Sequence, residues 1–372
     1  GLYLHWPFCQ AKCPYCDFNS HVVASVDQNR WAAAFEAEID RAAALTSDRL
    51  LNSIFFGGGT PSLMDPRTVD RIMSRVQARW RLANDLEVTL EANPTSIEAK
   101  RFAGYQAAGV NRVSIGVQAL NDRDLKALGR LHSANEALAA IDVARSNFDR
   151  VSFDLIYARQ NQALSDWEAE LEFALSLGPD HLSLYQLTVE DGTAFGDRFK
   201  RGRLRGLPDE NLAVDLWDTT QATCNSAGLP AYEVSNHAKP GQESRHNLIY
   251  WRSGDWVGIG PGSHGRLTIN GSRVETIDAK MPGDWISRIE RGETGKVVNS
   301  VLKADDVLDE RILMGLRIAE GIDVTRAWIK NKSNNINVLE DLDYIKLEAN
   351  RLTVTPQGRP LLNSIISQLL AN

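Results

Sequence analysis

The chain has 372 residues, of which 43% are hydrophobic, and it carries a net charge of −7. This length and composition favour one large domain with an apolar core and a smaller domain beside it. No run of five or six lysines or arginines occurs, so the chain lacks the basic footprint of nucleic-acid or anionic-membrane binding. It also lacks a run of eighteen apolar residues and a secretory signal pattern, so we expect a cytoplasmic protein without a membrane span.

Short β-rich runs alternate with longer amphipathic helical stretches from residue 2 to about residue 190. The expected strands cover residues 2–5, 53–56, 87–91, 112–117, 151–156 and 181–187, with helices such as 28–45 and 166–177 between them. Six strand–helix units in succession predict an α/β fold with a parallel sheet. We assign residues 1–190 to this core.

Residues suited to chemistry follow nearly every expected strand. The cysteines follow the first strand, residues 57–60 the second, Glu91 the third and Gln118 the fourth. An open sheet concentrates its ligand where the strand order reverses, whereas a barrel gathers all its strand ends around one mouth. We therefore predict a partial (β/α)6 barrel.

The remaining sequence is less regular and predicts two further parts. Residues 191–300, with a helix near 210–227 and many glycines and aromatic residues, predict a cap over the barrel mouth. Residues 301–372 predict a small α/β domain similar to a winged helix, with helices at 304–319 and 361–370 and strands at 344–347 and 351–354. Because the chain is acidic and has no basic stripe, we expect this domain to pack and not to bind nucleic acid.

Three of the four cysteines form a Cys-x3-Cys-x2-Cys loop at Cys9, Cys13 and Cys16. Cysteines this close together in a chain of this length are not a disulfide framework, and they predict metal binding. A structural zinc site or an ordinary ferredoxin cluster needs a fourth ligand, and no fourth cysteine lies nearby. His5 or His21 could complete a zinc site, which stays open as the alternative.

A 4Fe-4S cluster held by three thiolates keeps one iron without a protein ligand. S-adenosylmethionine (SAM) can bind this iron through its amino and carboxylate groups, and an electron from the cluster then cleaves it to a 5′-deoxyadenosyl radical. The cofactors carry this chemistry, and the protein supplies binding and orientation. We therefore predict a 4Fe-4S cluster and SAM as cofactors, and no catalytic side chain.

The cysteine loop, with the aromatic Tyr15 just before Cys16, resembles the signature of the radical SAM superfamily. More narrowly, the chain resembles the oxygen-independent coproporphyrinogen III oxidase group nearly end to end. The segments that carry this resemblance are Tyr3-x-His5, GGGTP at residues 57–61, EANP at residues 91–94 and SIGVQ at residues 114–118.

This resemblance implies roles for residues at successive strand ends. Gly58, Gly59 and Thr60 are implied to contact the methionyl amino end of SAM, since glycine lets the backbone approach a ligand closely. The resemblance further implies that Glu91 accepts hydrogen bonds from the ammonium or ribose, that Gln118 and Asp154 contact the ribose, and that Arg130 contacts the carboxylate. Tyr3 and Tyr15 are implied to pack near the cluster and the adenine.

Two subfamilies of this group differ in function. The oxidases typically carry a fourth cysteine two residues after the third, where this chain has Phe18. Haem chaperones of the HemW type carry a His-Asn-x-x-Tyr-Trp motif, which this chain matches at residues 246–251. An imidazole can bind haem iron and aromatic rings can pack on the porphyrin, so we predict that His246, Tyr250 and Trp251 contact haem.

The leading hypothesis is therefore a haem chaperone that holds haem, a 4Fe-4S cluster and SAM, and delivers haem to acceptor proteins such as membrane respiratory enzymes. The alternative is a coproporphyrinogen III oxidase that decarboxylates propionates to vinyl groups. Phe18 argues against this enzyme activity.

Overall fold

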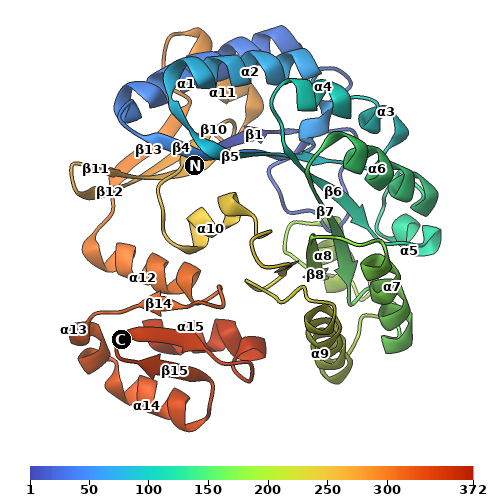
Figure 1. The fold of residues 1–372 in the computed structure, drawn as a ribbon, viewed down its shortest axis with the longest axis vertical. Coiled ribbons are helices and arrows are strands. Elements are labelled where there is room, and N and C mark those ends of the chain that lie inside the picture. Colours follow the sequence, from blue (N-terminus) through green and yellow to red (C-terminus); the bar gives the residue numbers. More distant parts are fainter. Residues whose placement is uncertain (372) are drawn as a thin grey trace.

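A computed structural model describes residues 1–371, and for residues 96 and 97 it describes the backbone alone. The largest element is an eight-stranded sheet with the strand order β10-β1-β4-β5-β6-β7-β8-β9 (Figure 1). Its strands are β1 (Leu2–Trp6), β4 (Leu50–Gly58), β5 (Arg81–Ala92), β6 (Arg112–Gln118), β7 (Arg150–Tyr157), β8 (His181–Gln186), β9 (Asn236–Ala238) and β10 (Val257–Ile259).

Six of these strands, β1 and β4 to β8, follow one another both in sequence and in the sheet, and neighbouring strands run parallel. This succession confirms the predicted α/β fold built from six strand–helix units. β10 continues the parallel sheet beside β1, and β9 closes the other edge as an antiparallel strand beside β8. Parallel neighbours place their carboxyl ends at one edge, so the residues that follow these strands come together there.

Helices from the first half of the chain lie on the outer face of the sheet (Figure 1). They are α1 (Gln28–Thr46), α2 (Pro66–Arg79), α3 (Ser96–Ala99), α4 (Phe102–Ala107), α5 (Asp122–Ala127), α6 (Ala134–Asn147) and α7 (Leu164–Ser176). In α1, Asp27 caps the first turn, and Trp31, Phe35 and Ile39 form a buried stripe. Their spacing of four residues keeps them on one helix face, which packs into the main hydrophobic core.

The region predicted as a cap, residues 191–300, supplies the two edge strands β9 and β10 of the main sheet. It also contains the helices α8 (Ala194–Lys200), α9 (Glu210–Ser226), α10 (Arg245–Trp251) and α11 (Pro282–Glu290). A separate antiparallel sheet consists of β11 (His264–Ile269), β12 (Ser272–Asp278) and β13 (Lys296–Val301). The main sheet and its covering helices form an arc, which is the predicted partial barrel (Figure 1). Helix α10 contacts β4 and lies inside this arc.

The C-terminal part has a hydrophobic core of its own, formed by residues between Ile312 and Leu369. Its elements are α12 (Ala304–Gly315), β14 (Ile322–Asp323), α13 (Arg326–Asn331), α14 (Ser333–Asp341), β15 (Ile345–Glu348), β16 (Arg351–Val354) and α15 (Leu362–Leu370). The predicted domain of residues 301–372 ends at a residue that lies outside the described part of the chain. Within residues 1–371, no helix combines the length and the apolar character needed to cross a bilayer.

Candidate functional site

The three clustered cysteines lie on one loop that follows β1. Cys9 ends the short strand β2 (Phe8–Cys9), which pairs in parallel with β3 (His21–Val22). Between these strands the chain turns back, and the amide of Cys16 donates to the carbonyl of Cys13 (3.1 Å). All three thiols are free; Cys9 is buried, and Cys13 and Cys16 are half-buried.

Donors from other strand ends reach two of these sulfur atoms. The hydroxyl of Thr60 donates to Cys9 Sγ (3.3 Å), and Arg130 Nη1 donates to Cys13 Sγ (3.3 Å). Burial raises the pKa of Cys9 and of Cys16. Hydrogen-bond donors and a nearby cation favour the thiolate form that binds metal, so Thr60 and Arg130 offset part of the burial effect at Cys9.

Close packing on two sides holds the cysteine loop in place. A Cβ atom on Gly59 would lie 2.7 Å from the carbonyl oxygen of Phe8, and one on Gly129 would lie 2.6 Å from Cδ of Pro14. Both approaches require glycine. Three thiols on such a braced loop are the ligand set that iron–sulfur clusters use. The residues present therefore fit a three-cysteine 4Fe-4S cluster.

The zinc alternative would require a histidine beside the cysteines. His5 has both ring nitrogens engaged, with Nδ1 bonded to the Tyr3 hydroxyl (3.0 Å) and Nε2 to the carbonyl of Asn19 (2.9 Å). Within residues 1–371, no three His, Cys, Asp or Glu side chains are arranged around a single ion position. His21 keeps Nδ1 free of hydrogen bonds in the same described range, so it is the lack of a three-ligand group around one ion that favours the cluster over zinc.

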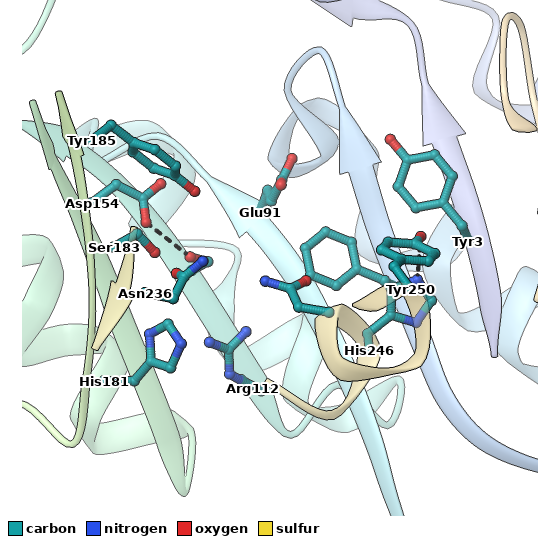
Figure 2. A pocket seen from close by; sticks show the side chains of 13 residues that line it. Tyr3, Glu91, Arg112, Asp154, His181, Ser183, Tyr185, Asn236, His246 and Tyr250 are labelled. Atoms are coloured by element: carbon teal, nitrogen blue, oxygen red, sulfur yellow. Dashed lines mark hydrogen bonds between the residues drawn. The ribbon is translucent and has the colours of Figure 1, made fainter. Parts of the chain in front are cut away.

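A cavity of about 280 Å³ occupies the barrel interior (Figure 2). Its lining residues come from the interior faces of the strands and from α10. They are Tyr3, Phe55, Glu91, Arg112, Ser114, Asp154, His181, Ser183, Tyr185, Asn236, His246, Asn247 and Tyr250. Three of the predicted SAM-binding residues, Tyr3, Glu91 and Asp154, are thus brought together around one space. Of the predicted haem residues, His246 and Tyr250 line the same cavity.

Two carboxylic acids, Glu91 and Asp154, line this cavity. Burial, and then the charge of Asp154, raise the pKa of Glu91 to about 8. Burial likewise raises the pKa of Asp154 to about 6. The amide of Gly58 donates to Glu91 (3.1 Å), and the Ser114 hydroxyl donates to Asp154 (3.3 Å). A ligand that carries an ammonium group or hydroxyls would find acceptors at both positions.

The segment Gly58, Gly59 and Thr60 uses its backbone amides to hold the site together. Gly58 donates to Glu91, as described above, while Gly59 donates to the carbonyl of Trp6 (2.7 Å) and Thr60 to that of Phe8 (2.8 Å). These amides bind protein atoms in the described structure. Contacts from this segment to a ligand ammonium would therefore use carbonyl oxygens or the Thr60 hydroxyl.

Arg130 connects the cysteine loop to two other strand ends. Besides Cys13, its guanidinium donates to the side chain of Asn93 (2.6 Å) and to the carbonyl of Gly116 (2.8 Å). Burial by itself lowers the pKa of Arg130, but Tyr15 and Cys13 raise it, and the net change is upward. Arg130 Nε is buried without a hydrogen-bond partner in the described structure. The guanidinium therefore stays charged beside the cysteines.

The other predicted cofactor residues have different surroundings. Gln118 ends β6 after a register irregularity and has a φ of 74°, which turns the chain sharply at the strand end. Tyr15 packs against Phe195, with ring centroids 6.4 Å apart, in a small cluster outside the residues that line the cavity. Gln118 lies at the predicted strand end, and Tyr15 lies within the cysteine loop.

His246 is buried on α10, and both of its ring nitrogens are hydrogen-bonded. Nδ1 bonds the hydroxyl of Ser53 (2.7 Å) and Nε2 bonds the hydroxyl of Tyr250 (2.6 Å). Trp251 is half-buried outside the cavity lining, and its indole Nε1 is buried without a partner in the described structure. The flanking Arg245 makes an ion pair with Asp85.

Several cavity residues were not predicted, and Arg112 is the most notable of them. Arg112 is buried, and its guanidinium donates to the hydroxyls of Ser152 (3.0 Å) and Thr89 (3.5 Å). His181 is also buried; Nε2 bonds Tyr232 (2.9 Å), and Nδ1 has no partner among the described atoms. A sequence signal existed, because Arg112, Ser114, Gly116 and Gln118 alternate with apolar residues, and alternate residues of a strand share one face.

Comparison with known proteins places the chain in a family. The sequence profile described as "Radical SAM superfamily" matches residues 3–174. "Heme chaperone HemW" of Escherichia coli is 42% identical over 389 aligned positions, which cover 100% of this chain and 98% of that protein. The chain belongs to the HemW family of the radical SAM superfamily. A 4Fe-4S cluster and SAM are the cofactors that this superfamily implies.

Other relatives also match along the whole of this chain. "Heme chaperone HemW" of Mycobacterium tuberculosis is 37% identical and covers 100% of this chain and 94% of its own length. The mouse protein "Radical S-adenosyl methionine domain-containing protein 1, mitochondrial" is 40% identical, with 100% and 87% covered. The solved coproporphyrinogen III oxidase HemN of Escherichia coli superposes with a TM-score of 0.83 over 99% of this chain and 89% of its own, at 21% identity. This last similarity shows that the fold is shared.

Proposed function

We propose that this protein is a haem chaperone that binds haem, a 4Fe-4S cluster and SAM, and transfers haem to acceptor proteins. The observation that carries the proposal is the 42% identity, over the whole chain, to a protein named as a haem chaperone. Phe18 in the place of a fourth cysteine agrees with this subfamily. Respiratory enzymes that use haem are the acceptors we propose, and the cytoplasm is the proposed compartment.

Cys9, Cys13 and Cys16 are the proposed cluster ligands in this function. The cluster, when bound, supplies the electron for SAM cleavage. The proposed SAM contacts are Tyr3, Tyr15, Gly58, Gly59, Thr60, Glu91, Gln118, Arg130 and Asp154. Two observations support them: Glu91 and Asp154 offer acceptors in the cavity, and Arg130, which bonds Cys13 Sγ outside the cavity lining, offers a cation for the SAM carboxylate.

His246, Tyr250 and Trp251 remain the proposed haem contacts on α10. In the described arrangement the imidazole is buried and bonded to Ser53 and Tyr250, so iron ligation requires α10 to move outward and Tyr250 to release Nε2. The variant Tyr250→Phe removes that hydroxyl and keeps the ring. If His246 binds the iron, Tyr250→Phe should bind haem at least as tightly as the wild type, whereas His246→Ala should lose affinity.

Oxidation of coproporphyrinogen III is the second candidate function, and one observation favours it. The buried guanidinium of Arg112 lines the cavity with hydroxyls as its hydrogen-bond partners, so it offers a place for a substrate carboxylate. An oxidase would bring a propionate close to the SAM site. Arg112 would then pair with a carboxylate of the substrate.

Two measurements on the anaerobically reconstituted protein distinguish these functions. A haem titration should give a saturable shift of the Soret band, and haem should then pass to an apo-acceptor. An assay with reductant, SAM and coproporphyrinogen III should give no protoporphyrinogen. Formation of protoporphyrinogen would replace the chaperone proposal with the oxidase, and absence of any haem binding would remove the chaperone proposal altogether.

A further inference from the structure

We propose that haem docks on the surface beside the cysteine loop, with the imidazole of His21 as its iron ligand. This inference rests on the proposed haem-binding function and specifies a site for it. The surface, called the rim patch here, consists of Lys12, Phe18, His21, Val22, Val23, Lys280 and Met281. It combines exposed apolar side chains, an accessible imidazole and two ammonium groups.

The apolar part of the rim patch is exposed. Phe18 is 59% exposed, Val22 54% and Met281 59%. Single exposed apolar residues are common on protein surfaces, but several together mark a surface for an apolar ligand or partner. The flat hydrocarbon face of a porphyrin is such a ligand.

One side chain joins the two segments of the patch. The amide nitrogen of Asn19 donates to the carbonyl of Lys280 (2.9 Å), and its Oδ1 bonds His21 Nε2 (3.2 Å). Phe18 and Met281 are the sequence neighbours of Asn19 and Lys280, so the two segments that carry them meet at this hydrogen bond. The patch lies directly beside the cysteine strand, because β3 pairs Val22 with Cys9.

The same hydrogen bonds determine the tautomer of His21. Asn19 Nδ2 faces two carbonyl oxygens, those of Pro261 (2.8 Å) and Lys280 (2.9 Å), and both can only accept. Asn19 Oδ1 must then face His21, so His21 Nε2 carries the hydrogen. In a neutral imidazole, Nδ1 keeps the lone pair. A histidine oriented by a hydrogen bond through one nitrogen and open at the other is the usual arrangement of a metal ligand.

Charge supports the same assignment. Burial lowers the pKa of His21, and the ammonium groups of Lys12 and Lys280 lower it further. The imidazole is therefore neutral near pH 7, as metal binding requires. The two exposed lysines also supply positive charge for the two propionate carboxylates of haem. A single haem can thus satisfy the apolar surface, the imidazole and both cations.

Accessibility distinguishes this site from His246. The His246 side chain is 1% exposed and has both nitrogens bonded, whereas His21 is half-buried and keeps Nδ1 free of hydrogen bonds within residues 1–371. Haem can reach His21 without any movement of α10. The rim patch therefore suits the first capture of haem from solution.

The test compares haem titrations of the anaerobically reconstituted full chain with those of His21→Ala, Asn19→Ala and Lys12→Glu/Lys280→Glu. The matched control is His264→Ala, which removes an exposed imidazole on β11. Each variant is first checked for iron content and for SAM binding, so that a disturbed cysteine loop is recognised. A parallel titration uses the dimethyl ester of haem, which lacks both carboxylate charges.

We expect His21→Ala to weaken haem binding by about tenfold or more and to change the iron spectrum, with iron content and SAM binding unchanged. The charge-reversed variant should weaken binding of haem but not of its dimethyl ester. Wild-type affinity and spectrum in His21→Ala would overturn the site. If the wild type itself bound no haem, the proposed function would fail first.

Discussion

At the scale of single residues, the cavity shows how a barrel interior changes side-chain chemistry. Glu91 and Asp154 line the same cavity as the guanidinium of Arg112 (Figure 2). Burial penalises the charged forms of both acids and raises their pKa values. Near neutral pH, Glu91 is therefore mostly protonated until a cationic ligand enters.

This raised pKa makes stability depend on pH through Glu91. The folded chain holds the Glu91 proton up to about pH 8, whereas an unfolded glutamate loses it near pH 4.3. Protonated Glu91 thus stabilises the folded state fully at low pH, and this stabilisation is lost as the pH rises toward 8. Glu91→Gln cannot titrate, so its melting temperature should rise relative to the wild type between pH 5 and pH 8.5. A difference that stays constant over this range would contradict the prediction.

At the scale of elements, the contact between the end of β4 and the strand β2 positions the cysteines. Gly59 and Thr60 donate to carbonyl oxygens of Trp6 and Phe8, and the Thr60 hydroxyl reaches Cys9 Sγ. The hydrogen bonds of the glycine-rich segment are therefore made to the cysteine loop and to the strand before it. Residue 59 lies so close to Phe8 of β2 that a side chain there has no room.

Substitution of this glycine tests the contact. In Gly59→Ala the new Cβ would lie 2.7 Å from the Phe8 carbonyl, so β2 must shift. We expect a loss of about 1–3 kcal/mol in the free energy of unfolding and a lower iron content after reconstitution. Gly283→Ala is the matched control, because nothing lies within 4 Å of its added Cβ. Equal iron content in the two variants would show that the contact does not position the cysteines.

A buried ion cluster provides a second brace at this scale. Arg159 donates to both Asp124 (2.8 Å) and Glu170 (2.5 Å), and Glu170 accepts from the amide of Leu120 (2.7 Å). These bonds tie the turn after β6 to α7. Gln118, two residues before that turn, is thereby held at the end of its strand.

At the scale of the whole molecule, the C-terminal part packs on its own core and joins the rest through polar contacts. Arg252 and Glu320 form an exposed ion pair (2.7 Å) across this junction. Arg266 is more buried, pairs with both Glu275 (3.1 Å) and Glu310 (2.9 Å), and lies over the ring of Trp256. The two arginines differ in burial and in the number of partners.

Their removal should therefore have unequal effects. Arg252→Ala should change the free energy of unfolding by less than about 1 kcal/mol, because exposed ion pairs contribute little. Arg266→Ala should cost roughly 1.5–3 kcal/mol, because it removes hydrogen bonds to charged groups in a less exposed place. Urea unfolding measures both values. Equal losses would mean that the exposed pair contributes as much to the junction as the buried one.

The sequence alone predicted much of the fold, because periodicity is a local property. All six expected strands of the core are present, and the strand–helix alternation led correctly to the α/β fold. The helix predicted at residues 304–319 ends earlier, at Gly315, and a turn region follows it. The participation of β9 and β10 in the main sheet was not predicted, since three-residue strands carry too little pattern.

By itself the sequence determined the cysteine loop and its chemistry, because the spacing of Cys9, Cys13 and Cys16 along a short segment needs no distant contact to be recognised. Only the tertiary structure decided which side chains meet. It gathered Glu91 and Arg112 in one cavity and occupied both ring nitrogens of His246. It also left His21 open beside two lysines. Burial and hydrogen-bond partners arise from residues far apart in the chain, so no local pattern can specify them.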